Sequence, residues 1–287
     1  MRLVEHPLPG SLPNLLGQPP AEAVSLVWLG QAGFVLDGGG HRVVIDPYLS
    51  DSLSEKYRGT RFPHDRLMPA PVASEAIRHV TAVLATHAHT DHLDPGTLPA
   101  LLDANPLAVL VAPASAAEVA VARAGIGPDR LRLLDSGDHL RIAPRLAVTA
   151  TRAAHETLER DDQGRYRFLG FAVHLAGATV FHSGDTVPFE GQTEEVQALG
   201  ADLALLPVNG RDETRRASGI PGNLTVEEAV MFARRAEIPS VIAHHFGLFD
   251  FNTVPRATVE AVAAALTDLQ LAPARIGAIY RLEQEAT

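Results

Sequence analysis

Four potential metal ligands at the end of one apolar segment constrain the fold of this chain more than any other feature. His87, His89, Asp91 and His92 lie within six residues, directly after the stretch Val80–Thr86, which has the pattern of a buried strand. Because alternate residues of an extended segment point the same way, we expect His87, His89 and Asp91 on one side and His92 on the other. Imidazole and carboxylate groups together suit divalent ions, so the fold must bring further ligands to this strand end.

Three further candidate ligands each follow another predicted strand. His155 comes after Leu146–Arg152, Asp185 after Thr179–Ser183, and the pair His244 and His245 after a strand that starts at Val241. Strand alternation lets only one histidine of that pair face the ions, and the residues themselves leave open which one.

This set of ligands has the composition of a two-ion site. We expect one ion on three imidazoles, a second on one carboxylate and two imidazoles, and a bridging carboxylate between the ions. The three imidazoles are His87, His89 and His155, the second group is Asp91, His92 and one histidine of the 244–245 pair, and the bridge is Asp185. A hydroxide shared by two such ions can attack a carbonyl carbon or a phosphorus atom, so the pattern indicates metal-assisted hydrolysis, with Asp91 as both ligand and orienter of the hydroxide.

The order of predicted elements is repeated in the two halves of the chain. Each half has a β-rich part followed by alternating strands and helices, which predicts an α/β four-layer αβ/βα sandwich in a single domain over residues 1–287. Residues 1–20 are rich in Pro, Gly and Leu and are expected to form an arm on the surface. Capping boxes predict helices after Ser115 and Thr225, and Asp51–Pro71 is expected to be a long functional loop.

The overall composition excludes several classes of protein. The chain has no cysteine, which removes disulfides, thiolate nucleophiles and Cys-based zinc sites. Its net charge of −10, from 24 basic and 34 acidic residues, works against a stable nucleic-acid complex. Without a signal-like segment at the N-terminus or an apolar run of about 18 residues, we expect a cytoplasmic protein that is not embedded in a membrane.

Taken with whole segments of the chain, the ligand pattern resembles the metallo-β-lactamase fold superfamily, and within it the ascorbate-6-phosphate lactonase branch. The segments that carry the narrower resemblance are Trp28–Phe34, Ile45–Asp51, His182–Thr186, Pro207–Asp212 and His245–Phe249. One departure is Gly247, where relatives often carry an acidic residue.

The resemblance implies a lactonase that acts on a phosphorylated sugar lactone. It also implies manganese or zinc as the two divalent ions, assembly into a homo-oligomer, and His245 rather than His244 as the ligand, since the ligand directly precedes an aromatic residue. A phosphodiesterase acting on cyclic nucleotides or RNA would use the same ions and is the alternative. A metal-binding protein without turnover is a different class, which seven competent ligand positions disfavour.

Other residues are candidates for supporting roles. Asp46 is expected to accept a hydrogen bond from a ligand imidazole, and His182 to be a buried, hydrogen-bonded residue beside the site. Arg211 is the first candidate for a substrate phosphate, and Arg58 and Arg61 in the long loop are weaker ones. Six other histidines are assigned to the surface or to sheet edges: His6, His41, His64, His79, His139 and His174.

Overall fold

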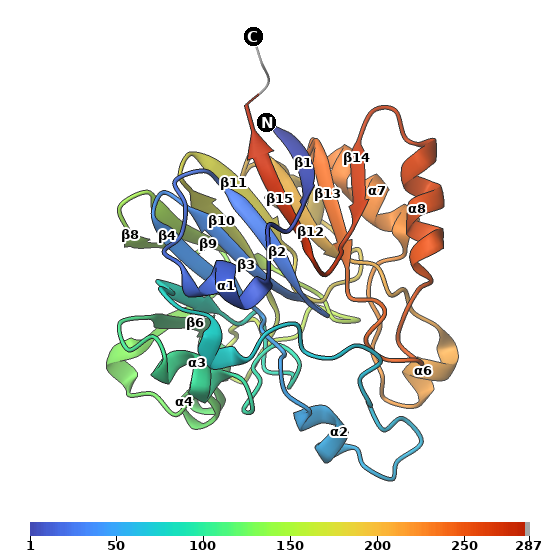
Figure 1. The fold of residues 1–287 in the computed structure, drawn as a ribbon. Helices are drawn as coiled ribbons and strands as arrows, with labels where there is room; N and C mark the ends of the chain where they lie inside the picture. Colours follow the sequence, from blue (N-terminus) through green and yellow to red (C-terminus); the bar gives the residue numbers. More distant parts are fainter. Residues whose placement is uncertain (285–287) are drawn as a thin grey trace.

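Two mixed β-sheets lie face to face in the computed structural model, which describes residues 1–284, and helices cover their outer surfaces (Figure 1). The first sheet has the order β1 (Arg2–Pro7), β15 (Ala278–Glu283), β2 (Ser25–Gly30), β3 (Gly33–Gly38), β4 (His41–Ile45), β5 (Ala82–Leu84), β6 (Val109–Pro113) and β7 (Leu131–Leu134). The second has the order β14 (Gln270–Pro273), β13 (Ser240–His244), β12 (Leu203–Pro207), β11 (Ala178–His182), β10 (Leu169–Leu175), β9 (Leu146–Arg152) and β8 (His139–Ala143).

The helices form the two outer layers. Those packed on the first sheet are α1 (Leu12–Gly17), α3 (Leu98–Asp103) and α4 (Ala117–Ala124), and those on the second are α5 (Gln192–Gln197), α7 (Val226–Arg235) and α8 (Arg256–Ala265). The short helices α2 (Ser52–Lys56) and α6 (Glu213–Ala217) lie in connecting segments. The predicted four-layer sandwich is therefore confirmed. Within residues 1–284, no helix combines the length and apolarity needed to cross a lipid bilayer.

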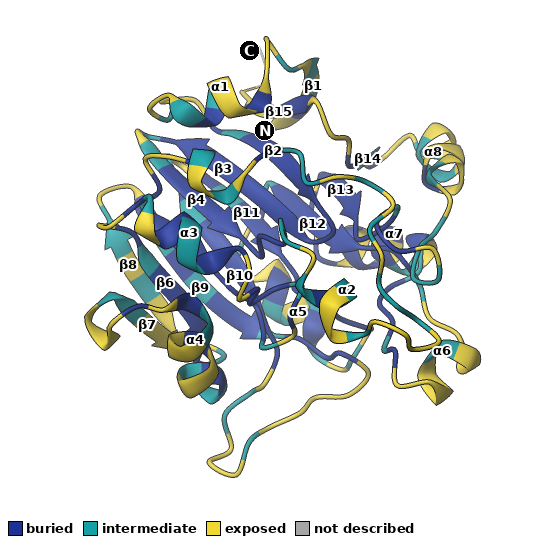
Figure 2. Cartoon of the chain, turned by 60° about the horizontal axis from the view of Figure 1, so that its bottom comes forward, coloured by how far each residue is buried: buried dark blue, intermediate teal, exposed yellow. Residues whose placement is uncertain are grey.

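The main core lies between the two sheets. Alternate residues of each strand point into it, for example Phe34 and Leu36 from β3 and Phe171 and Val173 from β10, all fully buried. Figure 2 shows these strands as buried, while the helices expose their outer sides. Burying side chains of this size contributes about 1.5–3 kcal/mol each, so the sheets form a rigid support for whatever lies at their ends.

The prediction of an N-terminal surface arm is wrong for most of residues 1–20. Residues 2–7 form β1, which pairs antiparallel with β15 at the edge of the first sheet, and Leu3 lies opposite Leu282. Leu3 and Leu16 are buried. The partner strand of β1 lies at the far end of the sequence, and no local pattern announces that pairing.

The two predicted capping boxes have different outcomes. At Thr225 the box is present, because its hydroxyl accepts from the Glu228 N–H at 3.2 Å and the Glu228 carboxylate accepts from the Thr225 N–H at 2.9 Å. The box at Ser115 is wrong. The Ser115 hydroxyl donates instead to the carbonyl of Tyr166 at 2.8 Å, and α4 begins only at Ala117.

A fully buried arginine joins the helical layer to the first sheet. The Arg42 guanidinium donates to both carboxylate oxygens of Asp37, at 2.8 and 2.7 Å, and to the carbonyls of Leu16 and Arg78. Removing one partner of such a pair leaves a buried charge without compensation.

We therefore expect Asp37→Ala to lower the free energy of unfolding by about 3–5 kcal/mol, measured by urea titration. Asp268→Ala is the control, because it breaks the bidentate but solvent-exposed pair with Arg234 and should change stability little. Equal losses in the two variants would contradict this account of Arg42.

Candidate metal centre

All seven candidate ligands lie at one edge of the sandwich, each just after a strand. The loop after β5 carries His87, His89, Asp91 and His92, while His155, Asp185 and His245 follow β9, β11 and β13. Because β9, β11 and β13 run in the same direction, their carboxyl ends meet at the same edge of the second sheet. The fold therefore gathers these side chains from four separate parts of the sequence.

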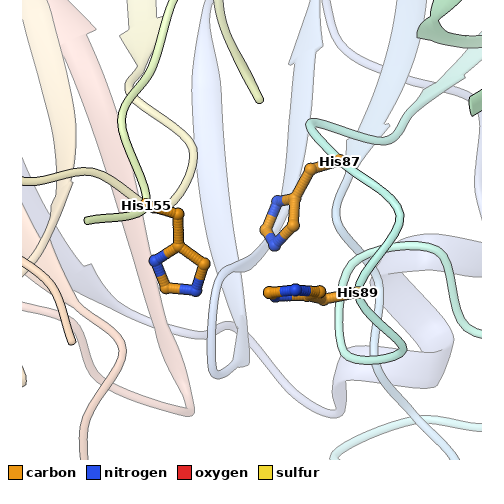
Figure 3. A group of neighbouring side chains, drawn as sticks. All are labelled: His87, His89 and His155. Atoms are coloured by element: carbon orange, nitrogen blue, oxygen red, sulfur yellow. The ribbon is translucent and has the colours of Figure 1, made fainter. Parts of the chain in front are cut away.

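The first group consists of the three imidazoles of His87, His89 and His155. Their rings converge on a common point (Figure 3), and one nitrogen from each lies within 4.8 Å of the others. His87 and His155 are buried, whereas His89 is exposed at the outer side of the group. Neutral imidazoles in this arrangement match a three-histidine site for a divalent ion.

The second group consists of Asp91, His92 and His245, whose ligand atoms also lie within 4.8 Å of one another. The Nε2 atoms of His92 and His245 are 3.7 and 3.8 Å from Oδ2 of Asp91. His245 has a φ of +65°, and its N–H donates to the carbonyl of Gln31 at 3.0 Å. Its neighbour His244 instead points into the core, with its ring 5.3 Å from that of Phe34, so the structure directs His245 and not His244 to the site.

Asp185 lies between the two groups. Its Oδ2 atom is 3.5 Å from Nε2 of His155, 3.4 Å from Nε2 of His92 and 3.2 Å from Nε2 of His245. The turn before it requires Gly184, which has a φ of +62° and where a Cβ would come within 2.5 Å of the Leu169 carbonyl oxygen. A single carboxylate oxygen thus contacts members of both groups.

The histidine loop reaches this geometry in a way that strand alternation does not describe. The strand ends at Leu84, and residues 86–92 form bends and a turn in which the N–H groups of His92 and Leu93 both donate to the His89 carbonyl. The expectation that His92 points away from His87 is wrong, since the turn brings their ring centroids to 4.0 Å.

Asp46 holds the His92 imidazole in place by a hydrogen bond. Its Oδ2 atom accepts from Nδ1 of His92 at 2.7 Å, and its two oxygens also accept from the N–H and hydroxyl of Thr86 at 2.8 and 2.7 Å. The hydrogen bond fixes the proton on Nδ1 and leaves Nε2 for an ion. Asp46 is fully buried and has a φ of +44°, a left-handed conformation that is unusual for a residue other than glycine.

His182 is buried beside the site and is not a member of either group. Its Nδ1 accepts from the N–H of Gly184 at 3.0 Å, and its Nε2 donates to the carbonyl of Ala32 at 2.9 Å. Both ring nitrogens are therefore used in holding the turn that presents Asp185.

Gln31 is a residue of the site that the sequence alone did not predict. Its Nε2 donates to Oδ2 of Asp91 at 3.0 Å and lies 3.1 Å from Nε2 of His245. The residue has a φ of +48°, and its carbonyl accepts from the indole N–H of Trp28 and the N–H of His245. A buried polar residue inside an otherwise apolar hairpin was the signal that could have identified it.

The charge states of the cluster favour metal binding. Burial and the neighbouring imidazoles of His92 and His89 hold the pKa of His87 well below its usual value. Burial likewise lowers the pKa of His155 to about 4. Both rings are therefore neutral at pH 7, which is the form that binds an ion.

His92 and Asp185 behave as an ion pair. Burial opposes charge on His92, but the carboxylates of Asp185, Asp46 and Asp91 outweigh it and raise the pKa of His92 well above its usual value. Burial alone would raise the pKa of Asp185, yet His245 and His92 hold it well below. An incoming ion has to displace the proton of His92, so metal binding weakens as the pH falls.

The polar atoms of the cluster also fit a metal. Nε2 of His87 and Oδ1 of Asp185 are buried and have no hydrogen-bond partner among residues 1–284, and Nε2 of His92 has no hydrogen bond besides its 3.4 Å ion pair with Asp185. A buried polar atom without a partner destabilises a fold by roughly 1–3 kcal/mol. Coordination by divalent ions would satisfy all three atoms.

A cavity of about 810 Å³ opens above the cluster, and five of the seven candidate ligands line it: His89, Asp91, His155, Asp185 and His245. Of the three arginines considered for binding substrate, Arg61 lines this cavity, whereas Arg211 and Arg58 do not. Arg211 forms a bidentate pair with Glu228, at 2.6 and 2.7 Å, at the start of α7. Arg58 is exposed on the loop after α2 and lies outside the lining. Both assignments are corrected, because one guanidinium is held by a carboxylate and the other is away from the cavity.

Comparison with known proteins agrees with the fold. Residues 41–246 match the model of the family described as "Beta-lactamase superfamily domain", and this range contains all seven candidate ligands. A UPF0173 metal-dependent hydrolase from Rubrobacter xylanophilus is 26% identical over 234 residues, which cover 79% of this chain and 83% of that protein.

Two solved structures share the architecture. The isothiocyanate hydrolase from Delia radicum gut bacteria has a TM-score of 0.70 and 19% identity, covering 87% of this chain and 95% of that one. Igni18, described as a novel metallo hydrolase from Ignicoccus hospitalis, has a TM-score of 0.62 and 20% identity, covering 91% and 100%. At these identities the likeness shows the fold alone.

Proposed function

This chain belongs to the metallo-β-lactamase superfamily of metal-dependent hydrolases, and from that premise we propose that it hydrolyses a lactone or a similar ester with two divalent ions. The observation that carries the proposal is the position of Asp185, whose Oδ2 atom lies within 3.5 Å of imidazoles from both ligand groups. One carboxylate placed in this way suits a pair of neighbouring ions.

Each group of side chains has a role in this proposal. His87, His89 and His155 would hold one ion, and Asp91, His92 and His245 would hold the other. Manganese and zinc are the ions we propose, because imidazole and carboxylate donors accommodate both. When bound, two such ions acidify water and polarise the oxygen atom of the group under attack.

The chain's own residues keep the ligands in position. Asp46 holds the tautomer and orientation of His92, Gln31 donates to Asp91, and His182 supports the turn before Asp185. Hydrolysis adds the oxygen of water to the carbonyl carbon and breaks the ring carbon–oxygen bond, which gives a hydroxy acid. The cavity above the cluster falls in the size range of small-molecule sites, which supports a small substrate such as a phosphorylated sugar lactone.

A substrate panel tests the proposal. The protein loaded with manganese or with zinc is assayed on lactones, simple esters, cyclic nucleotides and RNA. We expect metal-dependent hydrolysis of lactones, with phosphodiesters much slower. If only phosphodiesters are hydrolysed, the protein is a phosphodiesterase that uses the same ions and not a lactonase. Stoichiometric metal with no turnover on any substrate would contradict the proposal that the protein is an enzyme.

A further inference from the structure

One segment supplies an aromatic wall to the cavity above the metal ligands. We use the name aromatic wall for Tyr57, Phe62 and His64, which lie on the loop after α2 and line the cavity. The rings of Tyr57 and His64 are stacked with centroids 4.4 Å apart, and both Phe62 and His64 pack against Phe251, at 4.9 and 4.8 Å. All three rings of the wall are only half-buried, so apolar surface remains available to a ligand.

The loop that carries this wall is anchored at its C-terminal end, by Arg66 and Leu67. Its Leu67 N–H donates to the Leu248 carbonyl at 2.8 Å. Arg66 donates to the carbonyls of Tyr48 and Ser50 at 3.1 and 3.2 Å, and its guanidinium lies over the Tyr48 ring. These contacts fix the C-terminal end of the loop, on the same cavity that the candidate ligands line.

The basic residues of the cavity divide into two classes. The four that line it are Lys56, Arg61, Arg123 and Arg216. Arg123 donates to two backbone carbonyls of the histidine loop, and Arg216 pairs with Glu213 at 2.7 Å. By contrast, the side chains of Lys56 and Arg61 form no ion pair or hydrogen bond with any of residues 1–284 and lie over the Tyr57 and Phe62 rings, at 4.9 and 5.2 Å from the centroids.

Lys56 lines the same cavity as the candidate ligands His89, Asp91 and Asp185. Its ammonium lies over the Tyr57 ring, so the positive charge belongs to the same side of the cavity as the aromatic wall.

The negative residues of the cavity lie elsewhere on its lining. Apart from the ligand carboxylates, these are Glu156 and Glu159, on the segment after β9. An anionic group would be repelled from that segment and attracted to the loop after α2. The chain has a net charge of −10, so two cations without a partner among residues 1–284 give this side of the cavity a positive charge that is opposite to the overall charge.

We infer that Lys56 and Arg61 form a binding subsite for an oxyanion, a carboxylate or a phosphate, carried by the substrate away from the bond that is hydrolysed. Tyr57 and Phe62 pack against the carbon skeleton between the two. This inference rests on the proposed hydrolase function and narrows its substrates to anionic lactones and esters. It assigns anion recognition to Lys56 and to Arg61, the weaker sequence-based candidate that lines the cavity, in place of Arg211 and Arg58.

Matched pairs of substrates test the subsite in the metal-loaded protein. The 4-nitrophenyl monoester of glutaric acid and the neutral 4-nitrophenyl pentanoate form one pair, and a lactone with and without a phosphate group forms the other. Lys56→Met and Arg61→Met should each lower kcat/KM for the anionic member about 10- to 100-fold, mainly through KM, and leave the neutral member within about twofold. Arg160→Met is the control, because Arg160 also lies over an aromatic ring, that of Tyr166, to whose hydroxyl it donates, but it lies outside the cavity.

The two possible failures can be separated. Equal losses of kcat/KM on the anionic and neutral substrates, or the same loss in Arg160→Met, would contradict the proposed anion subsite. The proposed hydrolase function would not be affected. If the natural protein hydrolyses none of the four substrates, calorimetric binding of glutarate and of inorganic phosphate decides the subsite alone. Weaker binding in the Lys56 and Arg61 variants than in Arg160→Met supports it and identifies the preferred anion, whereas equal binding in all three contradicts it.

Discussion

Asp185→Ala should remove bound metal and hydrolytic activity together. The substitution takes away the carboxylate whose Oδ2 atom lies within 3.5 Å of His92, His155 and His245, so both proposed ion sites lose a ligand at once. Loss of a residue that only supports a ligand costs about 10- to 100-fold in metal affinity. Loss of a shared ligand should therefore weaken binding by at least about 100-fold.

Elemental analysis and lactone hydrolysis, measured on the same preparation, check this expectation. Circular dichroism tests whether the variant is folded, because the change removes a buried group. Asp103→Ala is the control, since it removes an exposed carboxylate from α3 and should keep both metal and activity. Normal metal content with full activity in Asp185→Ala would rule out the bridging role.

Asp46→Asn should give the second largest effect and one of a different kind. Asparagine keeps the size of the side chain and tolerates the left-handed backbone at this position. It offers one acceptor oxygen where Asp46 offers two to the donors of Thr86 and His92. With its N–H no longer held, the His92 imidazole loses its fixed tautomer, and metal affinity should fall about 10- to 100-fold.

Excess metal should restore the activity of Asp46→Asn but not that of Asp185→Ala. All seven ligands remain in Asp46→Asn, so a high metal concentration should recover most of its activity. Asp185→Ala should stay inactive under the same conditions. A metal titration of both variants against the natural protein makes the comparison, and an unchanged affinity in Asp46→Asn would show that Asp46 has only a structural role.

The sequence located the candidate ligands well because each one follows a recognisable apolar strand. His155, Asp185 and the His244–His245 pair each follow a predicted strand, which was enough to propose them as partners of the histidine loop, while the choice of His245 came from the family resemblance. Local signals were also sufficient at Thr225, where the capping box needs only residues three apart.

Features that depend on distant partners were not predictable in this way. β1 pairs with β15 from the opposite end of the chain. The Ser115 hydroxyl donates to the carbonyl of Tyr166 and does not cap the helix that follows it. Arg211 resembles a phosphate-binding residue until Glu228 is seen to hold it.

Side chains at turns show the same limit. His92 reaches His87 only because a turn replaces the expected strand, and Gln31 contacts Asp91 across 60 residues. Such contacts depend on backbone conformations, including the left-handed residues Gln31 and Asp46, that sequence periodicity does not encode.

The most direct test of the central claim is a titration of the metal-free protein with Mn²⁺ or Zn²⁺ while lactone hydrolysis is followed. A two-ion hydrolase predicts no activity in the metal-free protein and a rise that reaches its plateau at about two equivalents of ion. Full activity without metal, or a plateau at a single equivalent, would contradict it.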